Sequence, residues 1–422
     1  MRIAVTSLGV ALTLAVAAAC SSASGGGSHP ATLVVGEFNP FSGPDAAFGP
    51  EMVGGCVPAV RLINADGGVL RHRLTCVEED TKGDPSDAVT AAEQMMATQT
   101  HLIGVLGPSS DEALATVPVL NGGHVPMFAD TGQAAFDHSK YPYFWRITPA
   151  DDVKGYALAI WAHQKGYTRA AAIFGSDVGA QSDVPTLVTA FTKLGGTITY
   201  SKPLALQQTS YRTEIENMLA GHPQVIFTEV DPQTGATFLS ELQQLHGLIP
   251  VIGTEVSLQA PWLRAVKGAI GAGAMVKSFT GMQPYAPANT PGWTVYNKSL
   301  LTSGISNPSQ WSTDPYSMTY YDGVVVMALA MIAANSTNPS VFNAYITQVT
   351  EPGSGKTVVH TYAAGRAALR AGKQIQYVGA GGPIVFNFWH NSTGAFEAAQ
   401  YVNGQLKVAG TVTAAQIAQL TK

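Results

Sequence analysis

Short apolar runs alternate with helical patterns from residue 33 to about residue 280, and this alternation limits the possible folds more than any other feature. Leu33 to Glu37 has the composition of a strand, the residues from about Pro50 to Asn64 that of a helix, and Leu74 to Glu79 that of the next strand. Such alternation is typical of α/β proteins with parallel sheets. The pattern restarts with a helix at Asp151, so we expect a second lobe of similar design.

Size and composition favour two packed domains. The chain has 422 residues, more than a single hydrophobic core usually serves. Hydrophobic residues make up 46% of it and charged residues 12%, which argues against disorder. The formal net charge is -5, and no basic block or Arg-rich stripe is present, so nucleic acid is not expected as a partner.

The first twenty residues predict export. Arg2 precedes an apolar run that is interrupted by Thr, Ser and Gly, a pattern of secretion signals rather than of transmembrane helices. Three alanines lead directly to Cys20, as in the lipobox of bacterial lipoproteins. We therefore expect a lipoprotein signal peptide over 1-19, lipid attachment at Cys20, a flexible tether over 20-30 and anchoring to the outer face of the cytoplasmic membrane. Plain secretory cleavage is the alternative.

The two remaining cysteines form a candidate disulfide. With Cys20 assigned to lipid, Cys56 and Cys76 are left as an even pair in an oxidising compartment, where disulfides persist. Two separate buried thiols are the alternative.

The C-terminal part carries three further expectations. The glycine-rich stretch 268-273 is expected to be a connection and Met275 to Phe279 a strand. The apolar run Tyr320 to Ala334 predicts a long helix packed against a sheet. Ile384 to Trp389 and Phe396 to Val402 alternate around turn residues, which predicts a closing hairpin.

Seven short segments carry a family resemblance by their order and spacing: Phe41–Gly49, Ile63–Gly68, Glu79–Ala88, Gly107–Ser110, Tyr141–Arg146, Ile252–Glu255 and Tyr321–Gly323. From roughly Val34 to Leu406 the chain resembles the Leu/Ile/Val-binding proteins, which are substrate-binding lipoproteins of ABC importers. The resemblance implies a type I periplasmic-binding fold, in which two doubly wound parallel-sheet lobes are joined by three crossovers and enclose a ligand cleft.

The resemblance also implies a division of the chain and a function. Lobe one would comprise 31-149 plus 278-376, and lobe two 150-277 plus 377-422. The protein would be a monomer without enzymatic activity, cofactor or metal. It would capture a small amino acid, amide or carboxylate between its lobes and deliver it to an ABC permease.

In lobe one, the resemblance implies contacts to a ligand carboxylate. Ser109 or Ser110, at the start of a helix, would bind this carboxylate, and Thr131, in the turn after Ala129, would complete its site. Phe48 would line the pocket for the ligand's side chain. The structural alternatives are a helix cap for the serines, a loop residue for Thr131 and a core residue for Phe48.

In lobe two, the resemblance implies recognition of an ammonium. Glu255 matches the acid that receives the ligand's amino group, with a solvated loop Glu as the alternative. Asp231 adjoins a position at which the family offers a Tyr, and Asp130 adds an acid beside Thr131. We therefore expect a ligand with a carboxylate or similar polar head and a remainder that is cationic, amide-bearing or aliphatic.

Two other functional classes compete with transport. A secreted hydrolase is disfavoured because the sequence has no Gly-x-Ser-x-Gly, His-Glu-x-x-His or Cys-x-x-Cys motif. Its ten histidines are scattered singly, which also disfavours a metal site. A ligand-sensing receptor subunit of the same fold is the other alternative, and it would need a separate signalling partner.

Overall fold

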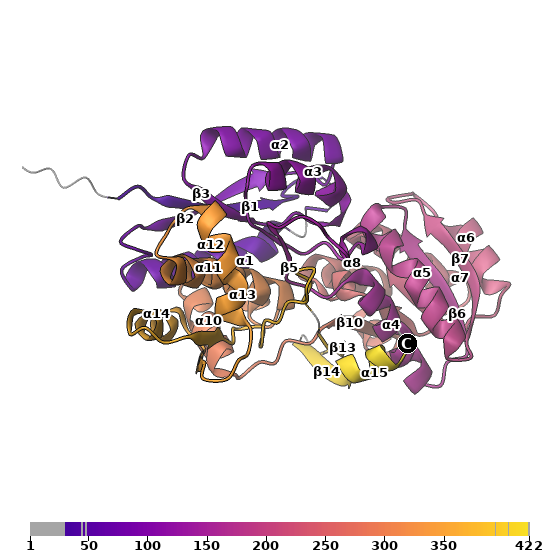
Figure 1. Cartoon of the computed structure of the whole chain (residues 1–422). Coiled ribbons are helices and arrows are strands. Elements are labelled where there is room, and N and C mark those ends of the chain that lie inside the picture. The colour runs from indigo at the N-terminus through magenta and orange to yellow at the C-terminus, as the bar shows by residue number, and fades with distance from the viewer. Residues whose placement is uncertain (1–29, 44, 47–48, 393, 404, 421–422) are drawn as a thin grey trace, which may run out of the picture.

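The computed structural model describes residues 30–43, 45–46, 49–392, 394–403 and 405–420. Within these residues the chain forms two α/β lobes side by side (Figure 1). The expected signal peptide and Cys20 lie outside the described residues, as do all but the last residue of the expected tether.

Lobe one is built on a five-stranded parallel sheet with the strand order β2-β1-β3-β4-β5. Its strands are β1 (Leu33–Asn39), β2 (Leu74–Asp80), β3 (Leu102–Leu106), β4 (Met127–Ala129) and β5 (Phe144–Arg146). The connecting helices are α1 (Gly49–Ala65), α2 (Pro85–Thr98) and α3 (Ser110–Gly122). All seven residues of β1 are buried, as expected for a strand covered on both faces.

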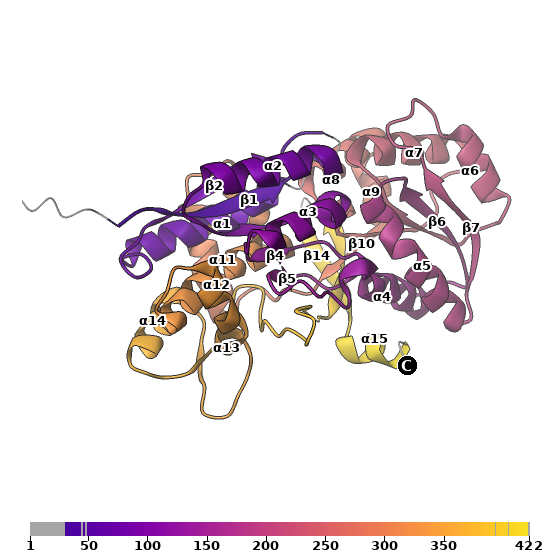
Figure 2. The ribbon, with the colours of Figure 1, turned by 45° about the horizontal axis from the view of Figure 1, so that its top comes forward.

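A second block of lobe one follows much later in the chain and packs on this sheet (Figure 2). It comprises α10 (Pro291–Leu301), α11 (Pro315–Ala334), α12 (Pro339–Phe342), α13 (Ile346–Thr350), β11 (Thr357–Val359), α14 (Tyr362–Arg370) and β12 (Ile375–Tyr377). Among the described residues, α11 alone has the length and apolarity of a membrane span, but 78% of its most apolar window is buried. This burial identifies α11 as the central helix of the lobe.

The predicted disulfide between Cys56 and Cys76 is confirmed. It joins α1 to β2, with the two Cα atoms 6.2 Å apart. Both the helix and the strand belong to the first β-α-β unit, so the disulfide fastens a connection that the sheet already holds in place.

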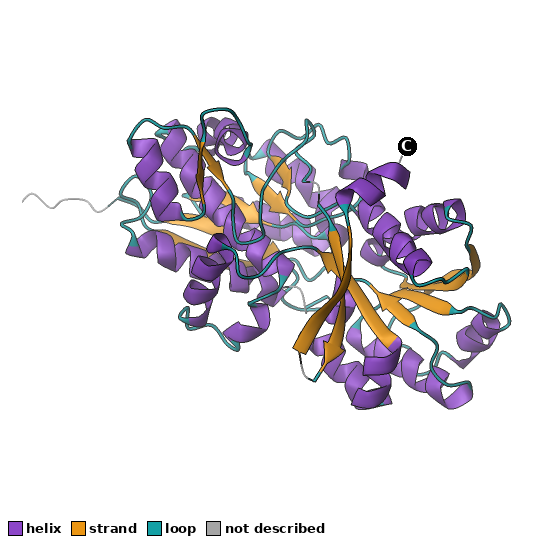
Figure 3. Cartoon of the chain, turned by 90° about the horizontal axis from the view of Figure 1, so that it is seen from below, coloured by secondary structure: helices purple, strands orange, loops and turns teal. Residues whose placement is uncertain are grey.

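Lobe two is built on a seven-stranded sheet with the order β14-β13-β10-β9-β8-β6-β7, and helices cover both of its faces (Figure 3). Its strands are β6 (Arg169–Gly175), β7 (Thr197–Leu204), β8 (Val225–Glu229), β9 (Val251–Gly253), β10 (Phe279–Pro284), β13 (Phe396–Val402) and β14 (Gln405–Val412). Its helices are α4 (Asp151–Gln164), α5 (Val178–Lys193), α6 (Arg212–Leu219), α7 (Pro232–Leu245), α8 (Ala260–Ile270), α9 (Ala272–Ser278) and α15 (Ala414–Leu420). All neighbouring strands are parallel except those that pair with β13.

The strand predicted over 275-279 is wrong, and so is the glycine connection over 268-273. Residues Ala260–Ile270 and Ala272–Ser278 form two helices separated by Gly271, and the strand starts only at Phe279. Gly268 and Gly273 have open space where a side chain would stand, so these helical glycines face away from the packed core. Gly271 takes a φ of +87°, which glycine tolerates, and this allows the break between the helices.

The predicted hairpin is half right. Phe396–Val402 is a hairpin strand, but its partner is the following strand, Gln405–Val412, rather than 384-389. The run 384-389 instead packs on lobe one, where Phe386 and His390 contact Trp145, with the His390 and Trp145 ring centroids 3.7 Å apart. The spacing of its aromatic residues resembles the alternation of a strand, but these residues serve tertiary packing.

Two of the expected lobe boundaries are displaced. β10 pairs with β9 in the second sheet, so the chain leaves lobe two after Pro284 rather than before 278. Tyr377, Ala380 and Phe386 belong to the core of lobe one, so the final crossing comes near 392-395 rather than at 377. The three crossings therefore lie at 147-150, 285-290 and 392-395.

Candidate functional site: an acidic cleft between the lobes

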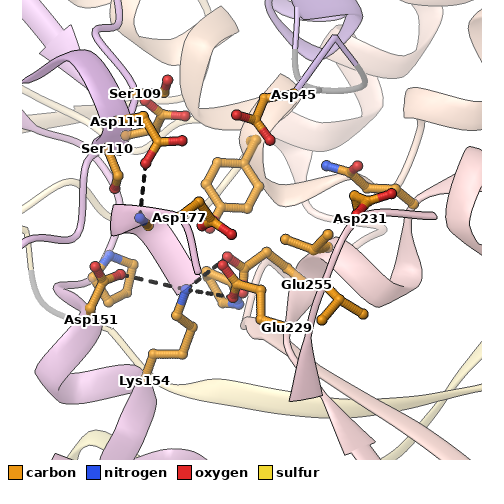
Figure 4. Close-up of a pocket in the computed structure, with 18 of the residues that line it drawn as sticks. Asp45, Ser109, Ser110, Asp111, Asp151, Lys154, Asp177, Glu229, Asp231 and Glu255 are labelled. Atoms are coloured by element: carbon orange, nitrogen blue, oxygen red, sulfur yellow. Dashed lines mark hydrogen bonds and ion pairs between the residues drawn. The ribbon is translucent and has the colours of Figure 1, made fainter. Parts of the chain in front are cut away.

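A cavity lies between the two lobes, beyond the carboxyl ends of strands from both sheets (Figure 4). Its empty volume is about 990 Å³, the space at its open mouth included. In open α/β sheets this edge collects the loops that follow the strands, so residues distant in sequence meet there. Eight acidic residues line it: Asp45, Asp111, Asp130, Asp151, Asp177, Glu229, Asp231 and Glu255. Among the described lining residues, Lys154 alone is basic.

Lys154, in the first turn of α4, joins four of the carboxylates around and beneath the cavity. Its side chain is only 8% exposed. Its Nζ lies 3.4 Å from Asp151, 3.2 Å from Asp183, 3.5 Å from Glu229 and 3.0 Å from Glu255. Burial lowers the pKa of Lys154, but the carboxylates around it, Asp183 foremost, outweigh burial and raise this pKa well above its ordinary value. Lys154 therefore stays protonated and acts as the resident cation of the cleft.

Burial raises the pKa of four carboxyl groups that line the cavity. It raises the pKa of Asp45 to about 8, with the nearby Asp111 adding to the shift. Burial likewise raises the pKa of Asp130 to about 7 and the pKa values of Asp151 and Asp177 to about 6. These groups take up protons near neutral pH because their negative charges are poorly solvated and lie close together.

The N-terminus of α3 borders the cavity, and an acidic side chain already occupies it. Ser109 caps the helix, and both its amide and its hydroxyl donate to Glu112, at 3.2 and 2.8 Å. This is a capping box, in which the third helical residue returns a hydrogen bond to the cap. The Ser109 amide and hydroxyl at this helix start are thereby engaged by a carboxylate of the chain itself.

At the starts of two helices of lobe two, aspartate side chains accept hydrogen bonds from first-turn amides. Asp177 caps α5 and accepts from the Ala180 amide at 2.7 Å. Asp231 caps α7 through one oxygen, Oδ1, which accepts from the amides of Gln233 and Thr234 at 2.9 and 3.2 Å. Amides in the first turns of α5 and α7, and the Ser109 amide before α3, are thus bound by carboxylates of the chain itself.

Internal hydrogen bonds engage part of the expected carboxylate site in lobe one. The Ser110 hydroxyl donates to Oγ1 of Thr131 at 3.4 Å, and the Gln133 side chain donates to the Ser110 carbonyl at 2.5 Å. Thr131 is fully buried, and neither it nor Ala129 is among the lining residues. Asp130, between them, does line the cavity.

Among the described residues, two hydrogen bonds that involve side chains cross from one lobe to the other. The Gly179 amide of α5 donates to Oδ1 of Asp111 on α3 at 3.0 Å. The Gln259 side chain of lobe two donates to the buried carboxyl group of Glu51 on α1. The lobes are therefore in direct contact at two places on the rim of the cavity.

A family model described as a periplasmic binding protein matches residues 32–405. The chain belongs to this family, in its Leu/Ile/Val-binding branch. Its members are extracytoplasmic solute-binding proteins of ABC transporter systems.

Curated relatives of this periplasmic binding protein match over a limited part of their length. The Leu/Ile/Val-binding protein BraC3 of Rhizobium johnstonii is 31% identical over 105 residues, which are 25% of this chain and 28% of that protein. The Leu/Ile/Val-binding protein homolog 3 of Brucella melitensis is 32% identical over 87 residues, 19% of this chain and 24% of that protein. The alignments thus span about a quarter of each relative.

Solved structures share the fold over nearly the whole chain. The leucine-binding protein LivK of Thermotoga maritima has a TM-score of 0.73 at 15% identity. The match covers 90% of this chain and 99% of LivK. A solute-binding protein of an R. palustris ABC transporter, in complex with 4-hydroxybenzoate, has a TM-score of 0.72 at 17% identity. The match covers 90% of this chain and 97% of that protein.

The periplasmic binding protein brings four of the expected ligand residues to the cavity: Ser109, Ser110, Asp231 and Glu255. Ala129 and Thr131 lie behind the wall, and Phe48 lies outside the described residues. Contact of any of these residues with a ligand stays a prediction. Glu255, expected to receive the ligand's amino group, already binds Lys154.

Sequence reasoning missed Lys154, together with five further acids of the lining. The spacing of Asp151 and Lys154 at a helix start resembles an ordinary surface ion pair, which hid their burial. Asp177 directly precedes Val178 and Gly179, which stand where the family has Tyr-Gly after a strand, and this departure was the available signal for an acidic wall. The other acids that were missed are Asp45, Asp111 and Glu229.

Proposed function

We propose that this periplasmic binding protein captures a small polar solute in the acidic cleft between its lobes and delivers it to an ABC importer. One observation carries the proposal: the acidic cavity is lined by both lobes and lies beyond the carboxyl ends of strands from both sheets. A solute held there contacts both lobes at once and thereby stabilises their closed arrangement relative to an open one.

The interlobe hydrogen bonds support closure as the binding event. Asp111 and Gly179, and likewise Glu51 and Gln259, can pair only when the lobes approach. Without a ligand, this approach brings the acids of lobe one toward those of lobe two, which opposes closure electrostatically. A solute that donates hydrogen bonds or brings positive charge relieves the opposition.

Structures of similar fold support the cleft as the place of binding. A branched-chain amino-acid transporter protein, LivJ of Streptococcus pneumoniae, was solved with isoleucine, and it shares this fold at a TM-score of 0.73 and 15% identity. The R. palustris protein described above was solved with 4-hydroxybenzoate. These two proteins of similar fold were thus solved with chemically different small molecules.

We further propose that acylated Cys20 holds the protein on the outer face of the cytoplasmic membrane. The lipobox-like alanines and the Gly/Ser segment behind Cys20 support this tether. A tethered protein stays close to its permease instead of diffusing through the cell envelope.

Ligand-induced closure tests the proposal directly. The purified full chain would be screened by thermal unfolding against amino acids, amides, small carboxylates and amines, with small-angle X-ray scattering for every hit. A true ligand at a hundred times its Kd stabilises the protein by about 2.7 kcal/mol, and we expect it also to reduce the radius of gyration. Turnover of the hit into a product, or binding without compaction, would reject the transport reading.

A further inference from the structure

We infer that the cleft binds an organic dication, such as a diamine, a polyamine or a guanidino-amine, rather than an amino acid or a carboxylate. This inference rests on the proposed function and names the chemical class of its ligand. Three independent features of the lining lead to it: its charge, the occupation of its anion-attracting groups, and its unused acceptors.

The charge of the lining exceeds what Lys154 can balance. With Asp45 and Asp130 counted as neutral because their pKa values are raised to about 8 and 7, six acidic residues of the lining still oppose one ammonium. Lys154 in addition serves Asp183, which lies beneath the cavity wall. One positive charge on a ligand leaves most of this excess uncompensated, whereas two reduce it further.

A ligand carboxylate would find few free donors. The start of α3 is occupied by Glu112, the Gly179 amide of α5 by Asp111, and the start of α7 by Asp231. Lys154 is surrounded by four carboxylates at 3.0 to 3.5 Å, so an additional anion there would be repelled. At these positions the attraction of helix N-termini for anions is met by carboxylates of the protein itself.

Acceptors, by contrast, are left over. Glu255 is 9% exposed and lines the cavity; its Oε1 binds Lys154, but its Oε2 is buried without a hydrogen-bond partner among the described residues. Oδ2 of Asp151, a lining residue that is 5% exposed, is likewise unpaired within the described chain. Oδ2 of Asp231 is a third such atom. Buried carboxylate oxygens without donors are costly, and ammonium or guanidinium groups supply the missing donors.

The acids lie on opposite walls, which calls for two separated cationic ends. Figure 4 shows Asp45 and Asp111 on the side of lobe one and Glu229 and Glu255 facing them from lobe two. The lining also includes apolar and aromatic side chains that suit an aliphatic linker: Val230, Pro232, Val256, Tyr316 and Phe396.

A matched series of three ligands tests the inference by isothermal titration calorimetry on the full chain at pH 8. 1,4-Diaminobutane, butylamine and 4-aminobutanoate share the same carbon chain and differ only at its second end. Diamines from 1,3-diaminopropane to 1,6-diaminohexane, together with agmatine, vary the distance between the two cationic ends. We expect the best dication to bind at least tenfold more tightly than butylamine, since a charge-assisted hydrogen bond contributes about that factor or more, and 4-aminobutanoate not to bind.

A pair of Asp→Asn variants places the dication in the cleft. Asp231→Asn removes a lining charge but keeps a side chain that caps helices well, so α7 should remain intact. Its control is Asp84→Asn at the exposed cap of α2, which accepts from two amides in the same way outside the cleft. We expect Asp231→Asn to weaken the best dication about ten- to a hundredfold and Asp84→Asn to leave its affinity unchanged.

The outcomes separate the inference from the proposed function. Binding of leucine, benzoate or 4-aminobutanoate in preference to every dication would overturn the inference and leave solute capture standing. Equal affinity for butylamine and the diamines would overturn it as well. If neither dications nor any solute of the wider screen bind, both the inference and the proposed function fail.

Discussion

Replacement of Lys154 by methionine removes the cation on which four carboxylates depend. Methionine keeps the length and the apolar stem of the side chain, so the change acts mainly on charge. The ammonium lies 3.0 to 3.5 Å from Asp151, Asp183, Glu229 and Glu255, and the Lys154 side chain is 8% exposed. Loss of one partner from a buried ion pair costs about 3–5 kcal/mol, because the other charge stays buried and uncompensated. We expect a loss in this range at pH 8.

The loss should shrink as the pH falls. Burial raises the pKa of Asp183 well above its ordinary value and that of Asp151 to about 6, so both carboxyl groups are less stable as anions in the folded protein. A carboxyl group with a raised pKa contributes its stability below the unfolded pKa and loses it as the pH rises through the folded pKa. Without Lys154 these pKa values rise further, so the Lys154→Met deficit should be larger at pH 8 than at pH 5.

Urea unfolding of the full chain, followed by circular dichroism at both pH values, measures these differences. Lys165→Met is the matched control: Lys165 is exposed at the other end of the same helix and lies 4.1 Å from the centroid of the Trp161 ring. An exposed cation–π contact is worth about 0.5–1 kcal/mol, so this control should cost no more. A Lys154→Met loss below about 1 kcal/mol, or one independent of pH, would refute the argued role of the ammonium.

Three further results are expected. Cys56→Ser together with Cys76→Ser should lower the free energy of unfolding by about 3 kcal/mol, the value for opening a loop of 20 residues, and a loss under 1 kcal/mol in urea unfolding would contradict this. Affinity for the best dication should fall from pH 8 to pH 5, because Asp45 and Asp177, with pKa values raised to about 8 and 6, then take up protons and lose their charge. Calorimetry at several pH values measures this fall, and Asp45→Asn should reduce the change in affinity at the upper end of the pH range. In a bacterial host fed an alkyne-tagged fatty acid, the full chain should acquire the label and Cys20→Ala should not, whereas equal labelling of both would exclude Cys20 as the lipid site.

Local rules predicted most of the secondary structure. The bounds of α1, Gly49–Ala65, and of β2, Leu74–Asp80, agree with the predicted helix and strand to within one residue, because turn residues follow the helix and the apolar composition marks the strand. The prediction failed at Gly268 to Gly273 and at 384-389, where the deciding contacts are not local. Burial of Trp262, Val266 and Ile270 in the core of lobe two holds the segment around Gly268 helical, and stacking of His390 on Trp145 holds the second run on lobe one.

The sequence by itself determined the two-lobed α/β class, the family, the candidate disulfide and several acids at strand ends, because periodicity, composition and motif order are properties of neighbouring residues. Only the tertiary structure decided what these acids do. Glu229 and Glu255 are separated from Lys154 by 75 and 101 positions, yet both reach its ammonium. The electrostatic interaction between two charges depends on their distance in space and not on their separation in sequence. The resident cation and the unused acceptors therefore become apparent only in the folded structure.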